Sequence, residues 1–217
     1  HPPMVAWLFA LGKKLELMHP NSIKFPGIIL GHLAILIWTY IYKEFSHEKM
    51  PDGPAVYSFL ILYLASPLLG FGSLILTPDL PLIFFWSLAL FFTIKYFKNQ
   101  NIKYALGIGV SLGLGFLSKY HIVLFVPPLL LWILIEKKWR EIRALDTIAA
   151  ILAGLAAAFP VIFWNFQNNF LSFKFQLNHG LGRTDYEIYW TWSFLLGQIF
   201  LIFPPVLISI LRTKFDR

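Results

Sequence analysis

The chain has 217 residues, of which 58% are hydrophobic and only 13% are charged, and its mean hydropathy is +0.66. Soluble globular domains carry about 25% charged residues, so this composition excludes a soluble domain and predicts an integral membrane protein. We attribute the net charge of +7 to basic residues in short loops that face the cytoplasm, rather than to nucleic-acid binding.

Residues 1–20 are predicted to form an amphipathic helix in the membrane interface. Apolar side chains recur at three- to four-residue spacing from Met4 to Met18, against lysines and a glutamate, which is the pattern of a helix that lies along a membrane surface. Pro2 and Pro3 suit the first turn of such a helix, where a missing N–H group costs little. Because the sequence opens on His1 and shows no signal-peptide pattern, we expect a piece of a longer chain.

The rest of the chain is predicted to be an all-α bundle with about seven membrane segments, forming a single domain over residues 1–217. A straight span needs roughly 20 residues, so the fourth and fifth segments are short. We interpret them as a helical hairpin with an external turn at Ser118–His121, and the alternative is one broken helix over 104–135. The apolar segments lie at about 22–42, 54–76, 80–97, 104–117, 121–135, 147–164 and 191–211.

The distribution of basic residues favours the hairpin. With seven segments and the N-terminus outside, most of the 18 lysines and arginines fall in inner loops, as the positive-inside rule requires. Merging the fourth and fifth segments would turn the basic 136–146 loop outward and leave fewer than half of the basic residues inside. Trp132 and Trp139 then flank an inner boundary, whereas Trp164 and Trp190 flank the outer one, where indole rings prefer the headgroup level.

The longest polar stretch, residues 165–190, is expected to be a large external loop. Residues 171–178 alternate as an extended segment does, but their phenylalanines also fit one face of a helix, and both interpretations stay open. His179 is a candidate ligand for a divalent metal or a donor to a phosphate, although a lone loop histidine usually binds nothing. Lys174 and Arg183 are candidate phosphate-binding cations in the same stretch.

Two short external turns add further ionisable groups. Asp79 lies in the motif Thr77-Pro78-Asp79-Leu80-Pro81, which fits a helix N-cap and equally a carboxylate held at the membrane surface beneath the 165–190 loop. Lys119, at the tip of the hairpin, is either an interfacial lysine that snorkels or a cation that meets a lipid phosphate at headgroup depth.

The motifs of soluble enzymes do not occur in the sequence: there is no P-loop, no Gly-x-Ser-x-Gly, no His-Glu-x-x-His and no dinucleotide fingerprint. The absence of cysteine excludes disulfides and thiolate chemistry. A multi-span transporter or lipid flippase is an alternative, which predicts ionisable groups at mid-membrane and paired halves. His32 lies well inside a span, but we find no internal repeat. A non-catalytic membrane scaffold is a third interpretation.

Four motifs in this order carry a family resemblance: His1–Leu8, Thr77–Leu82, Leu117–His121, and Trp164–Asn168 followed by His179-Gly180. Together they resemble the bacterial branch of the protein O-mannosyltransferase-like glycosyltransferases, which is glycosyltransferase family 39 of GT-C architecture. That branch includes the aminoarabinose and galacturonic acid transferases that modify lipid A. The resemblance covers essentially the whole chain and implies a GT-C-type helical bundle.

The resemblance also implies a reaction. A sugar would pass with inversion from a polyprenyl-phosphate carrier to a lipid or protein acceptor on the outer face of the inner membrane. His1 would correspond to a cation that contacts the phosphate, and His179 to an external-loop histidine that helps hold a metal or phosphate. The family's base is an aspartate that precedes the His-Pro-Pro motif, so we expect these 217 residues alone to be inactive, with Asp79 as the candidate substitute.

Overall fold

The computed structural model of the protein describes residues 2–15, 22–45, 57, 60–61, 63–64, 76–181 and 186–201. Every regular element in these residues is helical, which confirms the predicted all-α class. The elements are α1 (Met4–Leu15), a 3-10 turn (Ser22–Lys24), α2 (Phe25–Phe45), α4 (Asp79–Asn99), α5 (Ile102–Ser118), a 3-10 helix (Tyr120–Phe125), α6 (Val126–Ile135), a second 3-10 turn (Lys138–Glu141), α7 (Ala144–Gln167), α8 (Leu171–Leu181) and α9 (Ile188–Leu201).

Three described helices are long and apolar enough to cross a membrane: Phe25–Glu44, Asp79–Asn99 and Ala144–Gln167. Two shorter apolar helices, Ile102–Ser118 and Tyr120–Ile135, occupy the predicted fourth and fifth segments. The segment at 54–76 lies largely outside the described residues, and the one at 191–211 is described as far as Leu201. The structure therefore supports a helical membrane protein, whereas it does not show seven spans.

The predicted hairpin is confirmed, and the single broken helix is wrong. Two edge-to-face ring pairs join α4 to the returning arm, with Trp86 against Phe125 at 5.3 Å and Phe97 against Trp132 at 5.0 Å between ring centroids. The returning arm therefore runs beside α4 in the same direction and antiparallel to α5. Proline at the start of α6 is tolerated because the first helical N–H groups have no partner within the helix.

Helices α5 and α7 approach each other closely because glycines face small residues between them. A Cβ atom on Gly109 would lie 2.0 Å from the carbonyl oxygen of Ala150, and one on Gly113 would lie 2.4 Å from that of Gly154. Small residues at such interfaces allow helix backbones to pack in membranes, where lipid provides no hydrophobic drive for association. This seam fixes α7 against the centre of the bundle.

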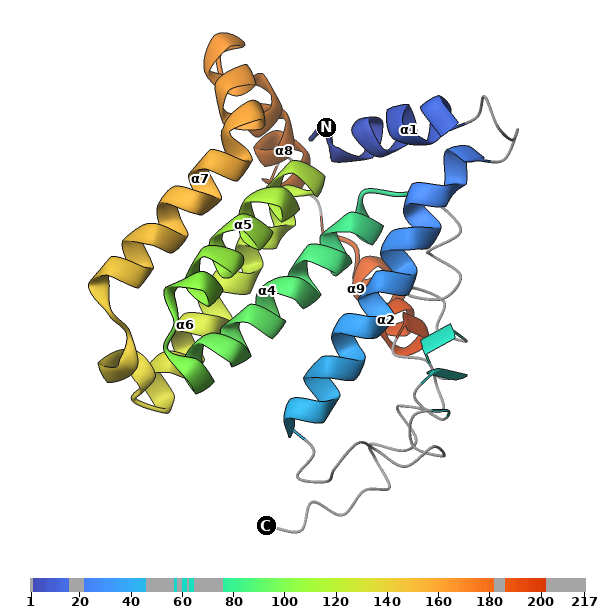
Figure 1. Ribbon diagram of the computed structural model, residues 1–217. Coiled ribbons are helices and arrows are strands. Elements are labelled where there is room, and N and C mark those ends of the chain that lie inside the picture. The colour runs from blue at the N-terminus through green and yellow to red at the C-terminus, as the bar shows by residue number, and fades with distance from the viewer. Residues whose placement is uncertain are drawn as a thin grey trace.

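The bundle has two ends that the chain visits alternately. The term 'Asp79 end' denotes the end at which α4 begins and α7 terminates. The term 'Glu44 end' denotes the opposite end, at which α2 and α4 terminate. Figure 1 shows α1 lying across the Asp79 end, above the neighbouring helices α2 and α4. Met4 of α1 is buried there in one cluster with Phe85, Leu117 and Val161, so the N-terminal helix is attached to the bundle.

The predicted interfacial helix is described as α1 over Met4–Leu15, and residues 16–20 of the prediction lie outside the described part of the chain. Trp7 and Leu11 on α1 remain 46% and 53% exposed. Apolar side chains left open beside a bundle of membrane helices fit a helix that contacts lipid at the interface. The exposed apolar side chains of α1 thus agree with the predicted amphipathic interfacial helix.

The polar segment 165–190, predicted as an external loop, is largely helical in the residues that the structure describes. Helix α7 continues to Gln167, α8 occupies Leu171–Leu181, and α9 begins at Ile188. Of the two conformations left open for residues 171–178, the helical one is confirmed. A sharp corner separates α7 from α8, and Asn169 and Phe170 form it with φ values of 53° and 57°.

Candidate functional site

The Asp79 end brings together the two ionisable groups predicted in the short turns. The Nζ atom of Lys119 donates to Oδ1 of Asp79 at 2.7 Å, although the residues are 40 positions apart. Their side chains are 36% and 44% exposed, so the ion pair is open to its surroundings. The pair is a direct link between the start of α4 and the end of α5.

Local backbone geometry places each member of this pair. The N-cap residue of α4 is Pro78, which makes no side-chain capping bond, so the prediction of an N-cap at Asp79 is wrong. Asp79 lies instead in the first helical turn, where the helix dipole favours a negative charge. Lys119 follows the last residue of α5 in an extended conformation, and its N–H group donates to the carbonyl of Gly115 at 2.9 Å.

A buried amide organises the residues next to this pair. Asn165 of α7 is fully buried, and its Oδ1 atom accepts hydrogen bonds from the hydroxyl of Ser172 at 2.7 Å and from the N–H group of the same residue at 3.2 Å. Its Nδ2 atom donates to the carbonyl of Val161 at 2.9 Å and approaches the hydroxyl of Tyr120 at 3.5 Å. The hydroxyls of Tyr120 and Ser172 lie 2.6 Å apart. Because all its polar atoms are paired, Asn165 can be buried without a desolvation penalty.

The corner between α7 and α8 is strained, and Asn165 holds it. The N–H group of Phe170 donates to the backbone carbonyl of Asn165 at 2.7 Å. A left-handed conformation in a bulky residue costs on the order of 1–3 kcal/mol and persists only where the surroundings enforce it. Side-chain and backbone bonds of one asparagine therefore set the direction in which α8 leaves α7.

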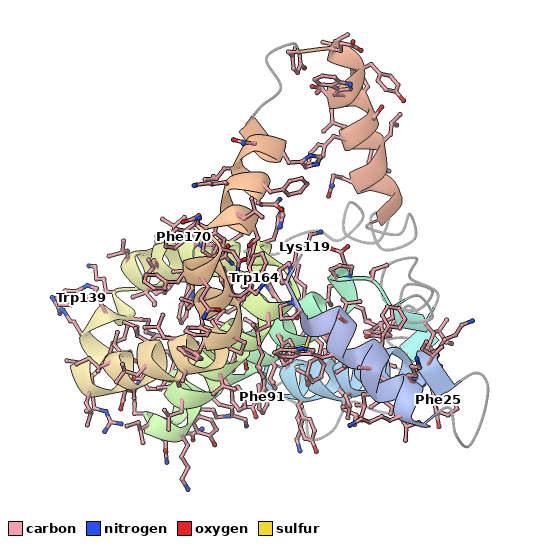
Figure 2. All side chains as sticks on the ribbon, turned by 90° about the horizontal axis from the view of Figure 1, so that it is seen from above. Phe25, Phe91, Lys119, Trp139, Trp164 and Phe170 are labelled. Atoms are coloured by element: carbon pink, nitrogen blue, oxygen red, sulfur yellow. The ribbon has the colours of Figure 1, made fainter. Side chains whose placement is uncertain are left out.

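Two cavities lie on either side of the Tyr120–Ser172 hydroxyl pair. The first, which we call the α8 cavity, has a volume of about 380 Å³ and is lined by Pro2, Tyr120, Trp164, Leu171, Ser172, Phe175 and Gln176. The second, the α1 cavity, has about 330 Å³ and is lined by Pro3, Trp7, Tyr120, Pro160, Val161, Trp164 and Ser172. Figure 2 shows Lys119 and Trp164 near the middle of this end of the bundle.

The other predicted site residues are less closely joined. Lys174 and His179 lie on α8 with exposed side chains, and the imidazole of His179 stacks on Phe175 with ring centroids 5.9 Å apart. His1 and Arg183 lie outside the described residues. Within the described part of the chain, no group of three His, Cys, Asp or Glu side chains is placed to hold a metal ion.

Sequence reasoning did not select Tyr120, Asn165 or Ser172 as site residues. Tyr120 lies in the motif Leu117–His121 next to Lys119, and Asn165 lies in the motif Trp164–Asn168 between two aromatic residues. The available signal was the polar amide of Asn165 at the end of a long apolar helix, because polar groups there need partners and often mark functional sites. Ser172 had no comparable signal, since it is a small residue in an alternating stretch.

Comparison with known proteins identifies the family of the chain. A family model described as dolichyl-phosphate-mannose-protein mannosyltransferase matches residues 1–164, from the N-terminus to Trp164 in α7. The chain belongs to this mannosyltransferase family. The expected family is thereby confirmed, and Asp79, Lys119 and Tyr120 all lie within the matched region. Helix α8 lies beyond it.

One curated relative of this mannosyltransferase-family chain is lipid A galacturonosyltransferase RgtD of Rhizobium johnstonii, which is 27% identical over 172 residues. The alignment covers 77% of this chain and 34% of RgtD, so the chain spans about a third of the length of that relative. No solved structure matches the chain. A membrane protein of a glycosyltransferase family is therefore established.

Proposed function

We propose that the complete protein transfers a sugar from a polyprenyl-phosphate carrier to a lipid or protein acceptor, with inversion, at the Asp79 end of the bundle. We place this end on the outer face of the inner membrane. The family and the relative named for lipid A support the class of reaction. The observation that carries the proposal is the open Lys119–Asp79 pair beside two cavities.

Lys119 is proposed to bind the phosphate of the carrier. Negative charge builds on that phosphate as the sugar leaves, and a cation already in position stabilises it. A solvent-exposed ion pair contributes only about 0–1 kcal/mol, so a phosphate can share or replace Asp79 as the partner of Lys119. Asp79 then serves to orient the lysine in the absence of the carrier.

A place for the carrier's apolar chain lies directly below this pair. A cavity of about 370 Å³ runs between α4 and the returning arm of the hairpin, and almost all of its lining is apolar, including Trp86, Leu90, Phe125 and Trp132. Trp86 follows Asp79 by roughly 10 Å along the helix, at 1.5 Å per residue. A prenyl chain could therefore lie in this groove while its phosphate reaches Lys119.

The remaining cations are proposed as secondary contacts to the phosphate: His1, Lys174 and Arg183, with His179 as a phosphate or metal contact. His179→Ala in the complete protein is expected to reduce transfer strongly, because an exposed imidazole on α8 can donate to an oxyanion. The measurement is the rate of sugar transfer in proteoliposomes. Unchanged turnover would remove His179 from the site.

The transporter alternative is less well supported. The Nδ1 atom of His32 lies 2.7 Å from the carbonyl oxygen of Ile28 in its own helix. Transport sites in membrane bundles usually pair such groups between helices. The described ion pairs lie instead at the two bundle ends, for example at Asp79 and at Glu44.

The test is Lys119→Ala in the complete protein, reconstituted in proteoliposomes with polyprenyl-phosphate galacturonic acid or polyprenyl-phosphate mannose. Loss of one charge-stabilising donor is expected to lower kcat by about 10²- to 10³-fold. Lys98→Ala is the matched control, because Lys98 also forms an ion pair but at the Glu44 end. Equal rates for both variants would reject the role of Lys119, and a wild-type protein that transfers neither sugar would reject the reaction.

A further inference from the structure

We propose that the α8 cavity binds the sugar ring of the donor lipid, with Trp164 as its platform and Gln176 as its polar contact. This inference rests on the proposed function and names residues that the family match does not assign. It is carried by the juxtaposition of open aromatic rings, a hydroxyl pair and an amide side chain around a single cavity.

The lining of the α8 cavity has the mixed character that a carbohydrate requires. A sugar ring has apolar C–H faces and a rim of hydroxyl groups, so it suits aromatic surfaces combined with a few fixed polar groups. The cavity offers Trp164, which is 46% exposed, and Phe175, which is 61% exposed. Gln176 adds an amide donor and acceptor to the lining. The hydroxyl oxygens of Tyr120 and Ser172, whose protons are donated within the network around Asn165, add acceptors.

The α1 cavity is a poorer candidate for the sugar. Its distinctive lining residues are Trp7, Pro160 and Val161, which offer few polar side-chain atoms. Val161 is buried in the cluster that anchors α1. The polar side chains of the α1 cavity include the hydroxyls of Tyr120 and Ser172, which it shares with the α8 cavity, but its described lining holds no amide such as that of Gln176. The α8 cavity therefore offers a sugar an amide contact that the α1 cavity lacks.

The position relative to Lys119 also fits a donor sugar. Tyr120 follows Lys119 directly, so their Cα atoms are about 3.8 Å apart. The same turn thus carries the proposed phosphate contact and a tyrosine that lines the α8 cavity. The acceptor is the competing occupant, and the experiment below separates it from the donor.

Asn165 is a positioning residue for this subsite. Its amide oxygen fixes Ser172, and its backbone carbonyl holds the left-handed Phe170 at the corner. Together these bonds aim α8 so that Phe175 and Gln176 reach the cavity beside Trp164. Because the family match ends at Trp164, Ser172 and Gln176 lie outside it.

The test compares two lipids that differ only in the sugar. Binding of polyprenyl-phosphate galacturonic acid and of polyprenyl phosphate is measured by titration of the complete protein in nanodiscs. Gln176→Leu and Trp164→Leu are each expected to weaken binding of the sugar-bearing lipid by about tenfold, the effect of one lost hydrogen bond or ring contact. Binding of polyprenyl phosphate is expected to stay unchanged, and Trp164→Phe should restore part of the loss.

Phe166→Leu is the matched control, because Phe166 is 73% exposed near the same end of α7 and lines neither cavity. It should leave both affinities unchanged. Equal weakening of both lipids by Gln176→Leu would overturn the sugar subsite while leaving the proposed reaction intact. A raised KM for the acceptor with unchanged donor affinity would overturn it in favour of an acceptor site. A wild-type protein that binds neither lipid and transfers no sugar would overturn the proposed function itself.

Discussion

Both ends of the bundle carry ion pairs, but the pairs at the two ends differ in exposure and in the number of their partners. At the Glu44 end, one carboxylate accepts hydrogen bonds from both Lys95 and Lys98, and Glu44 itself is only 12% exposed. These charged groups are paired within the protein, because Glu44 at the end of α2 forms ion pairs with two lysines of α4. This cluster holds helices together and leaves little capacity to bind a ligand.

A second closed cluster joins α4 to α7 at the same end. Asp146 is 2% exposed and accepts from the hydroxyl of Tyr96 at 2.8 Å and from Nε of Arg143 at 2.7 Å. Arg143 donates in addition to the carbonyl of Gln100 at 2.7 Å. The hydrogen bond to Asp146 raises the pKa of the Arg143 guanidinium above its usual range, so this group stays charged at physiological pH.

The Asp79 end shows the opposite arrangement. Lys119 and Asp79 form a single pair that is partly exposed, and the neighbouring hydroxyls of Tyr120 and Ser172 line open cavities. The contrast indicates which charged groups can bind a ligand. A charged group that has a single, exposed partner and lies beside a cavity can exchange that partner for a ligand. Three predictions test this distinction.

The largest effect on stability is expected from Asp146→Ala. The change removes the acceptor shared by Tyr96 and Arg143. The buried hydroxyl of Tyr96 then has no group to donate to, which is destabilising, whereas Arg143 keeps its bond to the carbonyl of Gln100. The measurement is the thermal unfolding midpoint in detergent, together with the transfer rate per folded molecule, which should remain near that of the wild type.

Asp79→Ala is the control for this prediction, because its pair is exposed and is expected to contribute only about 0–1 kcal/mol. Equal shifts in the unfolding midpoint for Asp146→Ala and Asp79→Ala would remove the distinction between a closed and an open end.

A smaller loss of stability is expected from Gly109→Ala, which acts on the seam that joins both ends. The added Cβ would meet backbone atoms of Ala150, which cannot rotate away, and overpacking of this kind costs about 1–3 kcal/mol. The measurement is again the unfolding midpoint, with hydrogen exchange at both ends to show that they loosen together. Gly197→Ala is the control, since its Cβ would meet no described atom within 4 Å. An unfolding midpoint for Gly109→Ala equal to that of Gly197→Ala would show that α5 and α7 are not in close backbone contact at Gly109.

The smallest effect is expected from Asp79→Asn, measured as kcat of the complete protein. An amide can still accept a hydrogen bond from Lys119, so only the orientation of the lysine weakens and kcat should fall by about tenfold. A general base contributes typically 10²- to 10⁴-fold. A fall beyond about a thousandfold would therefore identify Asp79 as the base rather than as the partner of Lys119.

Several features of the fold could be predicted from particular residues. Basic residues in the 136–146 connection indicated that it lies opposite the hairpin turn, and the structure places Lys119 and Arg143 at opposite ends of the bundle. The 165–190 segment could not be predicted, because phenylalanines spaced two and three apart fit both periodicities. Its conformation depends on the corner at Asn169 and Phe170, which is held by contacts of Asn165.

The sequence by itself determined the class of protein, the apolar helices, the hairpin turn and the family, because hydropathy, charge bias and motif order are properties of continuous segments. Tertiary structure alone decided which polar groups meet. Lys119 reaches Asp79 because α5 packs against α4, and Asn165 reaches Tyr120 because the glycine seam brings α5 and α7 into close contact. The corner between α7 and α8 brings Ser172 to Asn165. Such pairings depend on helix packing between distant segments, and neither periodicity nor composition encodes that packing directly.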